Sequence, residues 1–383
     1  MEYKKFEDSN IIIEYSECYN TELNINLELL RCDYYNIITD MLINLIDKYY
    51  SRKIFCKKKP FRRTITNILS NHIFSQYRKN NNTDDIFIPK LTDTDLLENI
   101  FKDYLNKDYS KEKIIQFFNE FNLEYLYIYN TFIAKKKIIK NNKINIMKKK
   151  VFIKDSEFIK LCPYKIYNKK YEVILYSERF TFLEKLYNSK NYTNAFNDII
   201  YCILLRYFTL GSNNNQLAVS PSKMNMFKDK YNLSFESFAS SINFISDYFC
   251  SVYPDLEKYF GSFGNFFSVK FIKGCFNFNP PFQEDIINIG IKKIFFHLEN
   301  SNEDLTFIVT IPVWDTEGKK LFGIEDTFSD LPIINEIKSN KFLKSIQAVS
   351  KENFNYHDYI FNLVKNVTIQ NTYLIILSNT TLY

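Results

Sequence analysis

Glycine is scarce in this sequence, and the first half has none. All seven glycines and six of the nine prolines lie after residue 210. Strand-rich and nucleotide-binding folds need glycine for tight turns, so we expect the glycine-free part to be helical. Apolar periodicity predicts helices at 27–49 and 96–105 and two more within 180–210, whereas 151–177 is strand-like. Residues 1–210 are therefore predicted to form a mostly α-helical domain.

Other absences narrow the class of protein. The seven cysteines include no CxxC pair, and the three histidines lie near no convincing set of partners. Zinc, disulfide and triad chemistry are therefore not expected. No stretch of 18 apolar residues occurs, and the N-terminus is polar, which disfavours a membrane span or signal peptide. We expect an intracellular protein, cytoplasmic or nuclear, or in the host cytoplasm if the source is a cytoplasmic DNA virus.

Positive charge is concentrated in two runs. Residues 51–63 contain seven Lys or Arg and residues 135–150 contain eight Lys, with no acidic residue in either. Such runs can follow a phosphate backbone, and we expect RNA contacts from the first run. The alternative is a solvated surface of a lysine-rich protein, with a helix that starts after Pro60. The expected RNA-binding residues are Lys57, Lys58, Arg62 and Arg63.

After residue 210 the pattern alternates between strands and helices. Apolar runs predict strands at 233–239, 274–278, 305–313 and 373–377. Helical patterns lie at 221–231, 243–253, 283–299 and about 330–345. Such alternation predicts an α/β fold, so residues 211–383 are expected to form a Rossmann-like domain.

The stretch FNFNPPF (276–282) is the most informative motif. A strand is expected to end at Phe278, and a helix follows Phe282, which places NPPF at the carboxyl edge of the sheet, where open α/β folds bind ligands. The Asn279 oxygen and a proline carbonyl can accept two hydrogen bonds from one amino group, while Phe282 stacks on its ring. This is the signature of amino-group methyltransferases. The alternative is an ordinary strand-to-helix turn that holds two prolines.

Two upstream stretches fit the same chemistry. LSFESFASSIN (233–243) reads as a strand, then small residues, then a helix, with Glu236 as the acidic residue of a nucleotide-binding motif. Small residues stand there in place of glycines, and they let the backbone approach a cofactor. AVSPSKMNMF (218–227) resembles the segment before the first strand of adenine N6-methyltransferases. Each stretch alone also fits an ordinary turn.

These stretches, together with YFGS (259–262), FIVTIPVW (307–314) and QNTYLIILSN (370–379), resemble the phosphorylated-CTD-interacting-factor family. Its members are cap-specific adenosine N6-methyltransferases, and the resemblance covers about 210–379. It implies S-adenosyl-L-methionine as cofactor and capped mRNA as substrate. Trp314 is implied to contact a base, although a buried packing role is as plausible. The implied catalytic residues are Asn279, Pro280, Pro281 and Phe282, and the implied cofactor-binding residues are Ser220, Pro221, Glu236, Ala239, Ser240 and Asn243.

The sequence also departs from that family. No Trp precedes Trp314, so we expect the family's WW module to be absent and binding to the polymerase tail to be unsupported. FASSIN (238–243) replaces the family's FASPLN, which is expected to loosen cofactor binding. The richness in Asn, Lys and Ile is typical of AT-rich genomes, which suggests a viral homologue. Three alternatives remain open: methylation of adenine in DNA or other RNA, methylation of a protein glutamine, and an inactive homologue that binds RNA or the cap.

Overall fold

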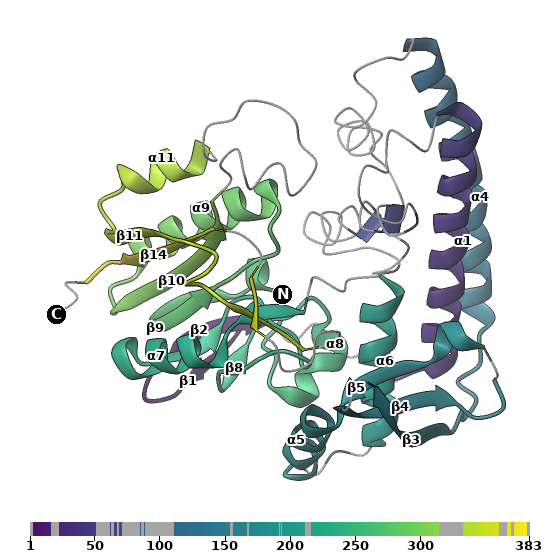
Figure 1. The fold of residues 1–383 in the computed structure, drawn as a ribbon, viewed down its shortest axis with the longest axis horizontal. Coiled ribbons are helices and arrows are strands. Elements are labelled where there is room, and N and C mark those ends of the chain that lie inside the picture. The colour runs from purple at the N-terminus through teal and green to yellow at the C-terminus, as the bar shows by residue number, and fades with distance from the viewer. Residues whose placement is uncertain are drawn as a thin grey trace.

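A computed structural model of the chain gives its fold (Figure 1). The fold is mixed α/β, with long helices beside a mixed sheet. The structure describes residues 3–16, 23–50, 111–153, 156–166, 168–190, 194–210, 216–313, 332–359, 366–368 and 371–380, and single residues 62, 65, 66, 69, 70, 85, 88 and 192.

The long helices belong to the first half of the chain. The predicted helix at 27–49 is confirmed: it begins after Asn24, whose side chain accepts the Leu27 amide at 3.1 Å and so caps the first turn. The two helices expected within 180–210 are confirmed as well, whereas 96–105 lies outside the described residues. The helices are α1 (Ile25–Tyr49), α4 (Lys111–Ile138), α5 (Ser177–Asn188) and α6 (Phe196–Thr209).

A three-stranded antiparallel sheet lies among these helices, in the order β3-β4-β5. It confirms the strand-like reading of 151–177. An N-terminal hairpin, β1–β2, pairs with β9 of the large sheet. A mostly helical N-terminal domain is therefore not clearly shown, because its residues also supply strands to two sheets. The strands are β1 (Tyr3–Glu7), β2 (Ile12–Ser16), β3 (Ile146–Ile153), β4 (Ser156–Pro163) and β5 (Val173–Tyr176), with a short helix η2 (Lys169–Tyr171).

The large sheet has eight strands and is mixed rather than parallel throughout. Strands β8, β7, β9 and β10 are parallel neighbours, whereas β14 is antiparallel to both β10 and β11. The strands expected at 233–239, 274–278, 305–313 and 373–377 all belong to it. Besides β1 and β2, the strands of this sheet are β7 (Leu233–Glu236), β8 (Tyr248–Phe249), β9 (Lys270–Phe278), β10 (Leu305–Pro312), β11 (Leu343–Val349) and β14 (Thr372–Ser378).

The two faces of β9 are buried against different elements. Phe276 and Phe278 pack with Ile287 of α9, while Cys275 packs on the other face with Met224 of α7. The second face also carries a small sheet in the order β13-β12-β6. The covering elements are α7 (Pro221–Tyr231), α9 (Glu284–Asn300), α11 (Pro332–Lys338), β6 (Leu217–Val219), β12 (Tyr356–Asp358) and β13 (Asn366–Val367).

The helix predicted at 243–253 is wrong. These residues form turns and the edge strand β8, because the Glu236 carboxylate accepts the amides of Ile245 and Ser246, which a helix would pair internally. The helix expected near 330–345 ends at Lys338, and β11 follows. The short helices after β8 are α8 (Pro254–Glu257), η3 (Lys258–Phe260) and η4 (Phe266–Ser268).

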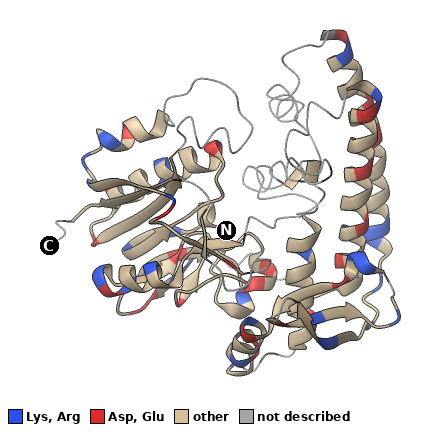
Figure 2. Ribbon diagram, viewed as in Figure 1, with Lys and Arg blue, Asp and Glu red and all other residues tan. Residues whose placement is uncertain are grey.

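Of the two basic runs, the second lies on the end of α4 and on β3 (Figure 2). Its lysines take part in local contacts: Lys136 pairs with the buried Asp85 at 2.9 Å, and Lys148 pairs with Glu184 at 3.3 Å. In the first run, Arg62 pairs with Asp40 of α1. Lys57, Lys58 and Arg63 lie outside the described residues. Whether the two runs meet and bind RNA stays a prediction.

No helix in the described parts of the chain is both long and apolar enough to cross a bilayer. The division at residue 210 stays a prediction. Contacts cross it, however: for example, the β1–β2 hairpin pairs with β9, and Phe244, Phe249 and Phe260 join the core of α1, α4 and α6.

A buried ionic cluster joins the helices to the second half. Arg206 of α6 donates to Glu28 of α1 at 2.7 and 2.9 Å and to Asp255 of α8 at 2.7 and 2.8 Å. Arg31 donates to Oε1 of Glu28, which Arg206 also reaches, and to Asp85. All five side chains are buried, so each charge depends on its partners in place of water.

We predict that Arg206→Met strongly destabilises the protein. The substitution leaves Glu28 and Asp255 buried without their shared cation, which typically costs about 3–5 kcal/mol. Urea denaturation measures the change. Lys341→Met, which removes an exposed ion pair with Glu299, serves as the control and is expected to change little. Equal effects of the two substitutions would contradict the prediction.

Candidate active site

The carboxyl ends of β7 and β9 meet at one edge of the sheet. Glu236, the last residue of β7, lies opposite Asn277 of β9 in a parallel pair, and the Ser237 amide donates to the Asn277 carbonyl at 2.8 Å. The segment after β7 and the NPPF turn after β9 therefore leave the sheet side by side. Open α/β sheets bind ligands at such an edge.

The NPPF turn lies between β9 and α9, as expected. The Asn279 side-chain oxygen is buried, and no described residue donates a hydrogen bond to it. The carbonyl of Pro281 accepts the Gln283 amide at 2.7 Å. The Pro281 carbonyl therefore already has a partner within the turn. Phe282 is half-buried, and its ring meets Tyr356 edge-on at 5.9 Å.

The segment after β7 is held by side chains rather than by glycine turns. Asn243 accepts the Ser240 amide at 2.7 Å, and the Ser240 hydroxyl donates to Gln216 at 2.6 Å. One oxygen of Glu236 accepts the amides of Ile245 and Ser246 at 2.6 and 2.7 Å. Burial raises the pKa of Glu236, whereas these amides lower it. Glu236 thus shapes this loop, and its contact with a cofactor stays a prediction.

Ser220 and Pro221 begin α7 at the same edge. Helix α7 runs directly into β7 through Asn232, whose left-handed backbone (φ 54°) ends the helix. The first turn of α7 therefore lies near the carboxyl end of β7. There the side-chain Nδ2 of Asn277 donates to the sulfur of Met224 at 3.5 Å. The structure brings the predicted cofactor residues together with Asn279: Ser220, Pro221, Glu236, Ala239, Ser240 and Asn243.

Five buried polar atoms at this edge have no hydrogen-bond partner among the described residues. Such atoms are rare in proteins, because burying a polar group without a partner is costly. A ligand with hydroxyl, amino and carboxylate groups would supply the missing hydrogen bonds. The residues therefore fit a polar cofactor such as S-adenosylmethionine. The atoms are Nε2 of Gln216, Oγ of Ser237 and Ser241, and Oδ1 of Asn277 and Asn279.

Four residues around this edge were not expected from the sequence: Gln216, Asn277, Arg179 and Glu257. Arg179 donates to the carbonyls of Ser241 and Phe244, and Glu257 accepts the Ser241 amide. Only Asn277, next to NPPF in a predicted strand, carried a local signal. The others come from distant parts of the chain.

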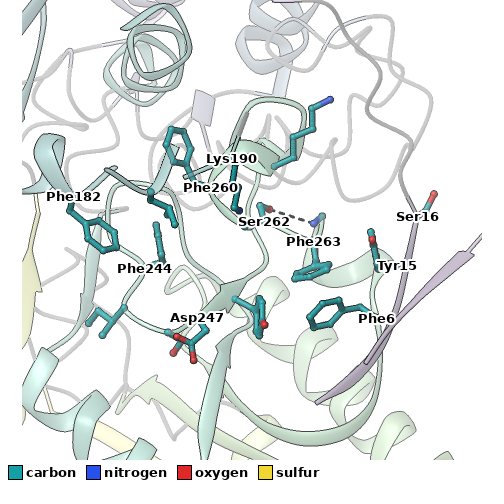
Figure 3. Close-up of a pocket in the computed structure, with 17 residues that line it drawn as sticks. Phe6, Tyr15, Ser16, Phe182, Lys190, Phe244, Asp247, Phe260, Ser262 and Phe263 are labelled. Atoms are coloured by element: carbon teal, nitrogen blue, oxygen red, sulfur yellow. Dashed lines mark hydrogen bonds between the residues drawn. The ribbon is translucent and has the colours of Figure 1, made fainter. Parts of the chain in front are cut away.

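A separate cavity of about 910 Å³ lies beyond the edge strand β8 (Figure 3). Its walls include Phe6 and Tyr15 of the N-terminal hairpin and Phe182 of α5, with Phe263 beside them. None of the predicted catalytic or cofactor residues lines it. It shares only the stretch from Phe244 to Ser246 with the segment after β7.

Trp314 lies outside the described residues, so its contact with a base stays a prediction. Among the residues that the structure describes, no group of three or more His, Cys, Asp or Glu is arranged to hold a metal ion.

The chain is similar to known proteins over part of its length. The family model described as "Phosphorylated CTD interacting factor 1 WW domain" matches residues 175–352. Two proteins named mRNA (2'-O-methyladenosine-N(6)-)-methyltransferase, from Mus musculus and Homo sapiens, are each 35% identical to it over 121 residues. The match covers 30% of this chain and 17% of each relative. At the level of the family, this similarity supports a methyltransferase.

The prediction that the WW module is absent is wrong, because the matching family model carries the name of that module. The exclusion of polymerase-tail binding depended on this absence and is withdrawn with it. The prediction considered one residue type, tryptophan, whereas the match extends over a long segment that includes β7, β9 and NPPF.

We predict that Gly290→Ala in α9 destabilises the protein by displacing Phe278, which precedes the NPPF turn. A Cβ at this position would lie 2.4 and 2.7 Å from ring atoms of Phe278, the residue before Asn279. Phe278 is fully buried against Phe238 and Phe266 and has no room to move. Overpacking costs about 1–3 kcal/mol, which exceeds the gain of about 1 kcal/mol from a better helix former.

Chemical denaturation tests this change, with Ile289→Ala at the neighbouring exposed position as control. A rise in the free energy of unfolding of Gly290→Ala, as at an ordinary helical glycine, would contradict the predicted clash.

We predict a pH dependence of stability from Glu257. Burial raises its pKa to about 7 from 4.5, although hydrogen bonds from Ser241, Ser251 and Tyr207 lower it. The fold therefore holds the proton more tightly than the unfolded chain does. The stability that this contributes is complete below pH ~4.5 and is lost as the pH rises through about 7. Glu257→Gln should remove this loss, which amounts to about 3 kcal/mol.

Urea denaturation at several values between about pH 5 and 8 measures this dependence. Asp255→Asn is the matched control, because its folded pKa is lowered and it does not titrate in this range. Parallel curves for wild type and Glu257→Gln would show that Glu257 does not titrate there.

Proposed function

We propose that this chain is an S-adenosylmethionine-dependent methyltransferase that acts on N6 of the adenosine next to the cap of mRNA. The observation that carries the proposal is the buried, unpaired Asn279 oxygen, which lies at the sheet edge beside the segment after β7. The similarity of 121 residues to two proteins named mRNA (2'-O-methyladenosine-N(6)-)-methyltransferase supports the same reaction.

The chemistry requires two acceptors at one amino group. The lone pair of an adenine amine is delocalised into its ring, so the nitrogen is a weak nucleophile. The Asn279 oxygen and the Pro280 carbonyl would each accept one N–H, which favours a tetrahedral nitrogen with its lone pair directed outward. Positioned dipoles of this kind act most strongly in a site that excludes water. Phe282, half-buried beside Tyr356, would stack on the adenine.

The cofactor residues bind and orient rather than react. When bound, S-adenosylmethionine supplies an electrophilic methyl group. Ser220, Pro221, Ala239, Ser240 and Asn243 would line its site, with Glu236 holding the loop between them. Orientation of two bound reactants accounts for much of the acceleration in transfers of this kind. No strong base is required, since the neutral amine attacks first. The nitrogen becomes positively charged when the methyl group has moved to it, and only then loses a proton to water.

The proposal predicts methyl transfer to a short capped RNA that begins with adenosine. Labelled S-adenosylmethionine and nucleoside analysis should reveal N6-methyladenosine at the first position. Asn279→Ala should lower kcat by on the order of 100-fold, as loss of one positioned polar group does elsewhere, with a smaller change in cofactor affinity. Asn300→Ala, at the far end of α9, is the control.

Other outcomes select other functions. Transfer to uncapped RNA or DNA in preference to capped RNA would replace the cap assignment with a different adenine substrate, and transfer to protein glutamine would replace adenine itself. The segment after β7 has no glycine, which favours an inactive RNA-binding homologue. Thermal shift with S-adenosylhomocysteine decides that case, because a ligand of the native state must raise the melting temperature.

A further inference from the structure

The backbone of Ser241 is held on one side by the side chain of Glu257 and on the other by the side chain of Arg179. Its N–H donates to Oε1 of Glu257 at 2.6 Å, and its carbonyl accepts from Nη2 of Arg179 at 2.9 Å. Ser241 is fully buried and lies between Ser240 and Asn243, two of the predicted cofactor residues. Both polar groups of this peptide are thus paired with buried side chains, and the bond from the Arg179 cation is charge-assisted, so this peptide has little freedom to move.

Glu257 connects this peptide to the helices of the first half. It is the last residue of α8 and is completely buried. Its second oxygen accepts the hydroxyl of Tyr207 from α6 at 3.1 Å. Two residues earlier, Asp255 pairs with Arg206, the neighbour of Tyr207. Helices α6 and α8 are thus joined at two adjacent points, and only the Glu257 contact continues to the segment after β7.

Arg179 approaches the same segment from α5. Its Nη2 also donates to the Phe244 carbonyl at 3.0 Å. The guanidinium lies over the rings of Phe244 and Phe182 at 4.5 and 4.7 Å, both of which line the wall of the cavity in Figure 3. The rings fix the plane of the guanidinium, and its Nη2 donates to two carbonyls of one turn.

We propose that Glu257 and Arg179 are positioning residues that hold residues 240–246 in the conformation that binds the cofactor. This inference rests on the proposed function for the identity of the ligand. A binding loop that is ordered before the ligand arrives binds more tightly, because the loop loses little further conformational entropy on binding. The segment has no proline to fix its backbone, so side chains of α5 and α8 supply the order.

A merely structural role would lower global stability without a local effect. Amide hydrogen exchange in the absence of ligand separates the two roles, because it reports local opening residue by residue. We expect Glu257→Leu and Arg179→Met each to speed exchange within 240–246 by about 10–100-fold, because each variant leaves a buried backbone group of this segment without its partner. Exchange in α9 should stay at the wild-type rate.

Calorimetry with S-adenosylhomocysteine gives the second readout. The dissociation constant should rise by about 10–100-fold in both variants, for the same reason. Glu257→Gln keeps an acceptor oxygen, and Arg179→Lys keeps a cation, so both should restore part of the affinity. Asp255→Asn is the matched control: it alters the same short helix but keeps an oxygen that accepts from Arg206, so α8 should stay in place and local exchange and affinity should stay near wild type.

Wild-type exchange rates within 240–246 in both Glu257→Leu and Arg179→Met would overturn the inference. So would an equal loss of affinity in Asp255→Asn at the same melting temperature. If either charged-residue variant fails to fold, Glu257→Gln and Arg179→Lys carry the comparison. A wild-type chain that binds no S-adenosylhomocysteine would refute the proposed function instead. The exchange rates alone would then decide whether Glu257 and Arg179 hold residues 240–246.

Discussion

The contact on which the rest of the structure depends is the buried double ion pair of Arg206 with Glu28 and Asp255. It joins α1, α6 and α8, which lie far apart in the sequence. A buried guanidinium tolerates few arrangements, because each displaced oxygen leaves a charge without water or partner. The position of α8 relative to α6 is therefore fixed closely, and Glu257, two residues after Asp255, inherits that position. Order in the long helices is in this way passed to the edge where β7 and β9 end.

Much of the fold could be predicted from the sequence where local patterns decide it. The strand β10 and the end of β9 are mostly apolar, and α9 has a clear helical period, so the elements within residues 274–313 were predicted nearly in full. The segment 243–253 was misread as a helix because its outcome depends on Glu236, which takes the amides of Ile245 and Ser246. The hairpin at residues 3–16 was missed because its pairing with β9 spans more than 250 positions. No periodicity within a segment reports a partner so distant.

The candidate site divides in the same way. NPPF and the residues after β7 could be found because a motif carries the chemistry in a few consecutive residues. Gln216, Arg179 and Glu257 could not, since an isolated Arg or Glu in a charged sequence looks like part of a solvated surface. Only the fold shows that Glu257 is completely buried, with each oxygen paired to a different element. Composition also misled in one respect: the count of tryptophans predicted the loss of a module whose family model matches residues 175–352.

The scarcity of glycine acquires a physical meaning at this edge. Glycine-rich loops bring backbone close to a cofactor because they lack side chains, but their flexibility must be overcome on binding. Here Ala239, Ser240 and Ser241 are small enough to allow a close approach. Ser241 has a backbone N–H that a proline at this position would lack. This N–H donates to Glu257. A loop of this kind gives up conformational freedom when the protein folds rather than when the ligand binds. Its affinity should therefore depend on residues in α5 and α8 that no ligand touches.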